Sequence, residues 1–147
     1  MIKIIKTEEE LIELHAVISE FYKLMPYKKK TLDPKEWATT WIQLIESGIG
    51  KVLALVEDNV IKGGIGLITH NSLEDGALVT TEAFWYVDEQ SRGGGIKLFK
   101  AAEEYAESIG SERMMMIHLQ NSMPEKVKKF YERMGFKKAE TTYLKEL

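Results

Sequence analysis

The sequence predicts a mixed α/β fold in which residues 1–147 form a single domain. Three observations support this prediction. Several segments carry apolar residues at steps of three and four and begin with helix-capping patterns. Short runs rich in branched and aromatic residues, typical of strands, lie between them. The length of 147 residues is that of one ordinary domain with a packed core.

A strand and a helix are expected first. Residues 1–6 are a short apolar run between lysines, which we interpret as a strand because it is too short for the apolar region of a signal peptide. Thr7 and Glu10 have the spacing of a capping box, so a helix should begin there. Its apolar face continues until Pro26 interrupts the pattern, and residues 27–31 should form a lysine-rich loop.

A second helix is indicated by Asp33 followed by Pro34, a start signal with proline at the first helical position. The apolar pattern continues to Gly48. Trp37 and Trp41 stand four residues apart and could form an aromatic wall for a substrate, but this helical spacing favours a place in the core.

A strand hairpin comes next, with strands over 52–56 and 60–68 joined by a turn at Asp58 and Asn59. The glycine cluster at 63–66 is not followed by a helix, so it indicates a bulge or a close approach of strands and not a phosphate loop. An aromatic-rich strand over 79–87 follows.

The remaining elements are a glycine-rich loop, Gln90 to Gly95, and a helix that Gly110 closes. A strand from Met114 to Leu119, a helix from Pro124 to Met134 and a last strand from Thr141 to Leu144 should complete the chain.

Composition excludes several classes of function. With 20 Lys and Arg against 23 Asp and Glu, the net charge of −3 provides no field for nucleic acid. Cysteine is absent and the three histidines are far apart in sequence, so no metal site is expected. No apolar run reaches about 18 residues, which argues against a membrane span and favours a cytoplasmic location.

The unit of strand, glycine-rich loop and helix around residue 93 is typical of an anion site. Free backbone N–H groups point out of a helix start, and the helix dipole favours negative charge there. Glycines at 93, 94 and 95 allow a diphosphate to approach the backbone and allow positive φ angles, while Arg92 adds a fixed charge. Such turns also occur only to connect elements, so this signal is weak by itself.

Two motifs give that loop its context. Gln90, Gly93 and Gly95 match the pattern Gln/Arg-x-x-Gly-x-Gly/Ala, and Phe130 to Phe136 reads Phe-Tyr-Glu-Arg-Met-Gly-Phe. In this order, about 40 residues apart and with a helix, a strand and a further helix between them, the two motifs resemble those of the GNAT superfamily of acyl-CoA-dependent N-acetyltransferases. The resemblance covers nearly the whole chain.

The chain departs from the family pattern at three positions. Glu89 replaces a common proline, and Gly94 stands where a basic residue is frequent. Pro124 occupies the position of a frequent asparagine, with Asn121 three residues earlier. These departures put a contact of Asn121 with CoA in doubt and imply weaker phosphate binding at Gly94.

The resemblance implies a mostly antiparallel central sheet with one splayed parallel pair, and helices on both faces. It implies acetyl-CoA as cosubstrate, a primary amine as acceptor and direct attack of the amine. The residues expected to hold acetyl-CoA are Tyr86, Val87, Gln90, Arg92, Gly93, Gly94, Gly95 and Ile96.

The resemblance also suggests catalytic residues. Glu82, on the strand that leads to the loop, is the candidate general base, and an exposed strand-edge carboxylate is the alternative. Tyr131 is the candidate general acid toward the CoA thiolate, and ordinary core packing is the alternative. His118 could face the acceptor or serve as a structural hydrogen-bonding group.

Other functions remain open at this point. The chain could be a non-catalytic acyl-CoA-binding or regulatory domain, or an interaction protein that uses the run Met114 to Met116 and the two tryptophans. The acceptor could be a small-molecule amine or a peptide amine. The lysines 28–30 form a basic run that is more typical of a solvated loop than of a partner site. An exposed last strand could pair with a second copy to form a homodimer.

Overall fold

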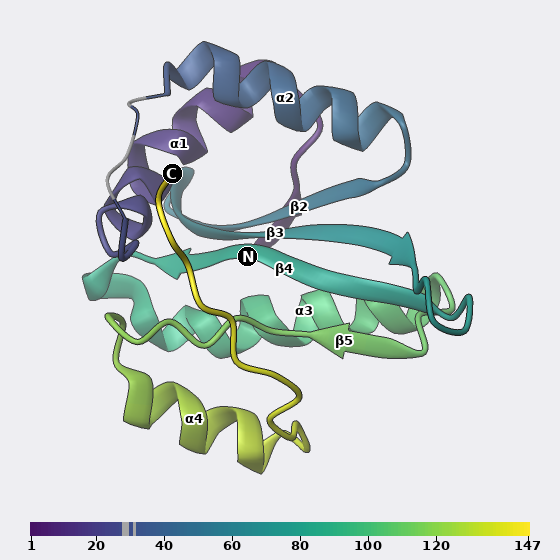
Figure 1. The fold of residues 1–147 in the computed structure, drawn as a ribbon. Coiled ribbons are helices and arrows are strands. Elements are labelled where there is room, and N and C mark those ends of the chain that lie inside the picture. Colours follow the sequence, from purple (N-terminus) through teal and green to yellow (C-terminus); the bar gives the residue numbers. More distant parts are fainter. Residues whose placement is uncertain (28–29, 31) are drawn as a thin grey trace.

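The computed structural model describes residues 1–27, 30 and 32–147. It shows one sheet with helices α1 and α2 on one face and α3 and α4 on the other (Figure 1). Residues 28 and 29 of the predicted lysine run lie outside the described residues. The mixed fold with helices on both faces is confirmed.

The sheet has five strands in the order β1-β2-β3-β4-β5. The first three pairs are antiparallel, and β4 pairs with β5 in parallel, as predicted. The strands are β1 Ile2–Ile4, β2 Gly50–Glu57, β3 Val60–Asn71, β4 Leu78–Val87 and β5 Arg113–Met115. The strand predicted from Met114 to Leu119 is thus shorter than expected, since only its start pairs with β4.

The capping signals place the helix starts correctly. Thr7 Oγ1 accepts a hydrogen bond from the Glu10 N–H at 3.2 Å, and Asp33 Oδ1 accepts one from the Lys35 N–H at 3.3 Å. The Glu10 carboxylate lies 3.5 Å from Lys3 Nζ. The helices are α1 Glu8–Tyr22, α2 Pro34–Glu46, α3 Gly95–Ser108 and α4 Pro124–Arg133.

The core has one layer on each side of the sheet. Between the sheet and helices α1 and α2, the rings of Trp37, Trp41 and Phe84 pack with centroids 5.4 to 6.1 Å apart. Both tryptophans are buried, which confirms their predicted place in the core. On the other face, Leu67 and Leu98 belong to the layer beneath α3.

Glycines in β3 allow the strands and helices to approach closely. A Cβ at Gly63 would lie 2.5 Å from the Tyr86 carbonyl oxygen, and one at Gly66 would lie 2.3 Å from the Phe84 ring. The register of β3 and β4 also shifts here, because Gly66 is opposite Phe84 while Leu67 is opposite Glu82. The predicted bulge and close approach are both present, and the extra residue is Ala83 in β4.

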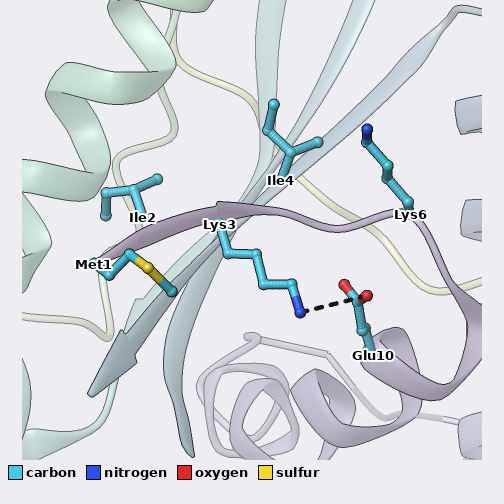
Figure 2. Close-up of a pocket in the computed structure, with 6 residues that line it drawn as sticks. All are labelled: Met1, Ile2, Lys3, Ile4, Lys6 and Glu10. Atoms are coloured by element: carbon cyan, nitrogen blue, oxygen red, sulfur yellow. Dashed lines mark ion pairs between the residues drawn. The ribbon is translucent and has the colours of Figure 1, made fainter. Parts of the chain in front are cut away.

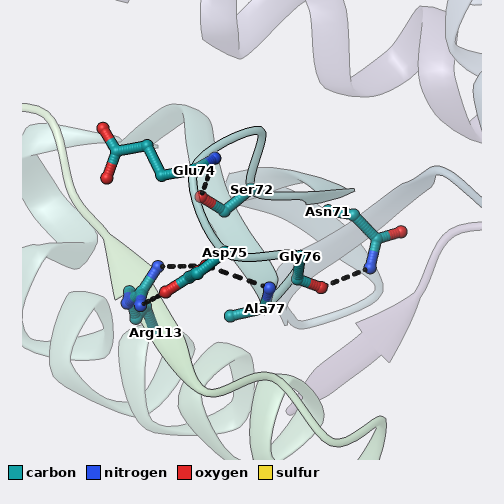
Figure 3. A network of polar contacts seen from close by, with 7 residues as sticks. All are labelled: Asn71, Ser72, Glu74, Asp75, Gly76, Ala77 and Arg113. Carbon is teal, nitrogen blue, oxygen red and sulfur yellow. Dashed lines mark hydrogen bonds and ion pairs between the residues drawn. The ribbon is translucent and has the colours of Figure 1, made fainter.

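Strand β5 is tied to the rest of the sheet at its first residue. The Arg113 guanidinium pairs with the Asp75 carboxylate in the β3–β4 loop, and Asp75 Oδ1 accepts a bond from the Ala77 N–H at 3.1 Å (Figure 3). The pair lowers the pKa of Asp75 to about 2, because Arg113 favours the carboxylate form. This pair therefore holds the first residue of β5 to the β3–β4 loop.

The predicted last strand, Thr141 to Leu144, is wrong. Residues 137–147 form no strand, and the side chain of Tyr143 is 91% exposed. Residues 141–144 are all exposed, so a strand here would bury no apolar side chain against the core. Figure 1 shows the segment leaving α4 without regular structure.

Candidate active site

A gap opens in the sheet where β4 and β5 separate. The last parallel pair is Thr81 with Met115, but β4 continues for six more residues to Val87. Over that stretch, no strand among the described residues pairs with the outer edge of β4. The predicted splayed pair is therefore present, and its opening begins beside Glu82.

One backbone N–H of β4 is directed into this gap. The Asp88 N–H donates to the Lys62 carbonyl on the β3 side at 2.8 Å. Because N–H directions alternate along a strand, the Tyr86 N–H also faces β3 and the Val87 N–H faces the gap. Of these two residues expected to contact acetyl-CoA, Val87 is the one that offers a donor there.

The bulge at Ala83 decides which way Glu82 points. Glu82 is opposite Leu67 and Trp85 is opposite Ile65, and both partners belong to the core layer beneath α3. Ala83 packs with the layer on the opposite face, beneath α1 and α2. Regular alternation would have placed Glu82 on the opposite face from Trp85, and the bulge puts them on the same face.

Glu82 is a buried carboxylate at the start of the gap. Glu82 is only 4% exposed, so the alternative of an exposed strand-edge carboxylate is wrong. Glu82 Oε2 accepts a hydrogen bond from the Ile117 N–H at 3.0 Å. Burial raises the pKa of Glu82 to about 8, although the bonds from Ile117 and Tyr131 act in the opposite direction. A carboxyl with this pKa can accept or release a proton near neutral pH.

Tyr131 reaches the same point from α4. Its hydroxyl donates to the Ile117 carbonyl oxygen at 2.6 Å and lies 3.5 Å from Glu82 Oε2. Burial, with the neighbouring Glu82 as a smaller contribution, raises the pKa of Tyr131 above its ordinary value. The phenol is therefore protonated at neutral pH and available as a proton donor.

A small cavity connects these groups across the sheet. It has a volume of about 40 Å³. Phe21 and Leu119 belong to the layer beneath α1 and α2, while Val127 and Tyr131 belong to the layer at α4. The cavity is lined by Phe21, Glu82, Trp85, Ile117, Leu119, Ser122, Val127 and Tyr131. It thus joins the two faces of the sheet at the gap.

The sequence alone did not identify several of these lining residues. Trp85 was placed in an aromatic strand, but its contact with Tyr131, with centroids 6.5 Å apart, depends on the bulge. Phe21 and Leu119 come from segments nearly 100 residues apart in the chain. No local pattern marks such residues as neighbours.

His118 and Asn121 lie in the segment between β5 and α4 and make structural contacts. His118 Nε2 is 2.7 Å from the Pro124 carbonyl oxygen, which fits the structural reading of this histidine. Asn121 Nδ2 donates to the Leu24 carbonyl at 3.4 Å, so it links this segment to the end of α1.

The glycine-rich segment is helical and not an open loop. Residues Glu89–Gly94 form a 3₁₀ helix, η1, that leads directly into α3 at Gly95. Asp88 starts it by accepting a hydrogen bond from the Gln90 N–H at 3.1 Å. None of the three glycines has a positive φ, so the expected left-handed conformations are absent.

The three glycines serve different purposes. A Cβ at Gly94 would lie 2.3 Å from Leu55 Cδ2, so a larger residue here would force the buried Leu55 side chain to shift. A Cβ at Gly93 would meet nothing within 4 Å, and Gly93 lies at the surface beside Arg92 and Ile96. The surface that a phosphate can reach therefore centres on Gly93 and not on the buried Gly94 and Gly95.

The residues of this segment fit a diphosphate in charge and shape. Gln90 is exposed, and the Arg92 side chain is 37% exposed. Arg92 Nη1 contacts Met123 Sδ at 3.0 Å, and Nη2 lies 3.9 Å from Glu89 Oε1, so no strong ion pair occupies it. The guanidinium, the open surface of Gly93 and the following helix start together suit an anion.

A family comparison agrees with this geometry. Residues 13–136 match the model of the acetyltransferase (GNAT) family. The chain belongs to the GNAT acetyltransferase family. No protein of curated function matches it in a sequence comparison.

Solved structures share the GNAT fold over the whole chain. An acetyltransferase of Trypanosoma brucei has a TM-score of 0.76 at 19% identity, covering 100% of this chain and 99% of its own. A ribosomal-protein-alanine N-acetyltransferase of Brucella melitensis gives 0.73 at 15%, with 100% and 99% covered. An aminoglycoside acetyltransferase from an uncultured soil sample, in complex with trehalose, gives 0.76 at 14%, with 100% and 95% covered. At these identities the likeness establishes the fold alone.

A larger hollow lies elsewhere on this GNAT protein. It measures about 550 Å³ and is lined by the edge strand β1 and Glu10 (Figure 2). Ile2 and Ile4 lie on one side of the strand and Lys3 on the other, where it pairs with Glu10. The hollow is open and contains neither family motif, so we assign the site to the smaller cavity.

Two further classes of site have no support in the described part of the chain. No group of three or more His, Asp or Glu side chains among these residues is placed to hold a metal ion. No helix within residues 1–27, 30 and 32–147 is long and apolar enough to cross a membrane.

Proposed function

We propose that this GNAT protein is an N-acetyltransferase that transfers the acetyl group of acetyl-CoA to a primary amine by direct attack, with residues 1–147 as one acetyltransferase domain. The observation that carries the proposal is the meeting of the Glu82 carboxylate and the Tyr131 hydroxyl, 3.5 Å apart, in a buried cavity at the sheet gap.

Acetyl-CoA would supply the activated acetyl thioester. The 3₁₀ segment would hold its diphosphate through Gln90, Arg92 and the open side of Gly93, with Ile96 exposed beside them. The buried Gly94 and Gly95 would contribute by letting the segment pack closely beneath this surface. The Val87 N–H, turned into the gap, would hold the thioester carbonyl oxygen and stabilise the negative charge that develops on it. Tyr86, the residue before Val87, would also contact acetyl-CoA.

Glu82 would remove the proton from the attacking amine. Deprotonating a lysine-like amine at pH 7 costs about 4 to 5 kcal/mol, whereas an α-amine costs about 1 kcal/mol. A carboxylate whose pKa is about 8 is a much stronger base than an ordinary glutamate, because burial disfavours its charge. Glu82 therefore suits an acceptor whose amine is protonated in water.

Tyr131 would give a proton to the leaving thiolate. Its hydroxyl donates to the Ile117 carbonyl in this structure, so it must exchange that bond for one to the sulfur. The distance between Tyr131 and Glu82 is short enough for one proton to pass from base to acid after the reaction. An acceptor that arrives as an ammonium would first lose one proton through Glu82 to solvent. The proton lost as the amide forms would then pass from Glu82 to Tyr131, and both residues would return to their starting states.

The relatives of known fold suggest two kinds of acceptor. One is named as acting on an alanine of a ribosomal protein and another on aminoglycosides. These acceptors belong to the proteins of similar fold. For this chain we propose a small-molecule or peptide amine.

The test is release of CoA thiol with a panel of amines, using wild type and Tyr131→Phe. Thiol release that depends on an amine, and that falls in the variant, is expected. Binding of CoA with no release for any amine would instead favour a non-catalytic acyl-CoA-binding domain of the same fold.

A further inference from the structure

We infer that the acceptor is a primary amine on an uncharged, apolar arm, and that amines with a second positive charge close to the first are rejected. This inference rests on the proposed acetyl transfer. It concerns the part of the cavity that lies on the α1 face of the sheet.

If acetyl-CoA occupies the α3 face of the sheet, the acceptor must approach from the α1 face. The segment proposed to hold acetyl-CoA is on the α3 face, since a Cβ at Gly95 would lie 3.8 Å from Trp85 and from Val87. The donor would therefore reach the gap from the face of α3 and α4. The acceptor amine would then enter past Phe21 and Leu119, which belong to the opposite layer.

The described lining of the cavity is nearly free of charge. Among these residues Glu82 is the one charged side chain, and Ser122 supplies the other polar group besides the Tyr131 hydroxyl. Glu82 carries at most one negative charge, so it can neutralise one ammonium and not two. At the end of α1, Glu20 pairs with Lys23 at 2.7 Å, and both side chains are exposed and outside this lining.

A second ammonium within this lining would be buried without a partner. Burial of an unpaired charge is strongly unfavourable, while burial of a methylene is favourable. The same lining therefore discriminates between two acceptors of equal size. It favours the one that carries a methyl group where the other carries an ammonium.

The volume restricts the carbon next to the amine. A cavity of about 40 Å³ is close to the space that one water molecule occupies. The space beside Glu82 and Tyr131 is therefore narrow, and an unbranched carbon next to the amine suits it best. The rest of the arm must lie against Phe21 and Leu119, where aliphatic or aryl groups pack well.

The direct test compares pentylamine with 1,4-diaminobutane, which have the same number of heavy atoms, by thiol release with the wild-type chain. We expect kcat/KM for pentylamine to be at least about a hundredfold higher. Among propylamine, butylamine and pentylamine, kcat/KM should rise about threefold to fourfold per methylene. An equal or higher value for the diamine, or for an aminoglycoside, would overturn the inference.

A charge variant gives a second readout. Leu119→Asp places a carboxylate on the acceptor side and should reduce the preference for pentylamine at least tenfold. The matched control is Leu73→Asp, since Leu73 is fully exposed at the β3–β4 loop and should leave the preference unchanged. If Leu119→Asp does not fold, the comparison of pentylamine with 1,4-diaminobutane on the wild-type chain still tests the inference.

The failure of this inference differs from that of the proposed function. Thiol release that prefers diamines would overturn the apolar acceptor and retain acetyl transfer. No release with any amine, despite acetyl-CoA binding, would overturn both.

Discussion

The Glu82 carboxylate accepts a hydrogen bond from the Ile117 N–H at 3.0 Å, just beyond the last paired residues of β4 and β5. The carbonyl of the same residue accepts one from the Tyr131 hydroxyl. Both backbone groups of Ile117 are therefore bonded to side chains and not to a neighbouring strand. The gap stays open without leaving these buried polar groups unsatisfied.

Glu82 should make the stability of the chain depend on pH. Its pKa is about 8 in the folded chain and is ordinarily 4.5, so between these values the folded chain holds one more proton than the unfolded chain. The free energy of unfolding should therefore fall as pH rises through this range, by up to about 1.4 kcal/mol per pH unit, and level off above pH 8.

Glu82→Gln should remove this dependence, because the amide keeps the neutral shape and does not titrate. Urea unfolding at pH 5 to 9 measures the effect, with Glu104→Gln on the exposed side of α3 as control. If the free energy of unfolding of the variant fell with pH as steeply as that of wild type, Glu82 would not be the source of the pH dependence.

Glu82 should also set the pH dependence of activity. As a general base it must be ionised, so kcat/KM should rise with pH and level off near 8. An acceptor amine whose own pKa is below 7 keeps its titration out of this range. In Glu82→Gln the rise of kcat/KM with pH should disappear, and kcat should fall about a hundredfold or more. If kcat/KM of the variant still rose fully with pH, a group other than Glu82 would be responsible.

Tyr131→Phe should separate catalysis from binding. We expect kcat to fall about a hundredfold, with little change in the Kd for CoA, because the phenol is proposed to act on the leaving thiolate and not on the diphosphate. Loss of its bond to Ile117 should also lower the free energy of unfolding by about 1 to 2 kcal/mol. Tyr143→Phe, on the exposed C-terminal segment, is the control. Unchanged turnover would leave Tyr131 with a structural role only.

Alanine at Gly93 and at Gly94 should have opposite consequences. Gly94→Ala should lower the free energy of unfolding by about 1 to 3 kcal/mol, because its Cβ would overlap Leu55. Gly93→Ala has free space and should keep the stability, but its methyl group should weaken CoA binding about tenfold. Calorimetry of CoA binding and thermal unfolding measure both effects. Normal CoA affinity in Gly93→Ala would place the diphosphate elsewhere.

Breaking the pair of Arg113 and Asp75 should loosen β5. In Arg113→Ala, amide hydrogen exchange at Met114 and Met115 should become faster, since only three residue pairs hold β5 to β4. The wild-type pair should weaken as pH falls toward 2, where Asp75 becomes protonated. Lys23→Ala breaks a pair on α1 and should leave β5 exchange unchanged.

Some expectations from the sequence failed for reasons that lie outside the local pattern. The segment Thr141 to Leu144 contains residue types that favour strands, but its side chains are exposed and bury no apolar face against the core. Gly93, Gly94 and Gly95 permit positive φ angles, yet the cap from Asp88 and the packing of Gly94 on Leu55 favour a helical turn.

The sequence by itself determined the order of the helices and strands as far as α4, the helix starts at Thr7 and Asp33, and the two motifs of the GNAT family. These features depend on neighbours along the chain. Only the tertiary structure decided that Glu82 and Tyr131, 49 residues apart, meet at Ile117. A single extra residue, Ala83, turns Glu82 toward α4, and the early end of β5 opens the space between them. Both depend on how strands pair, which no local spacing encodes.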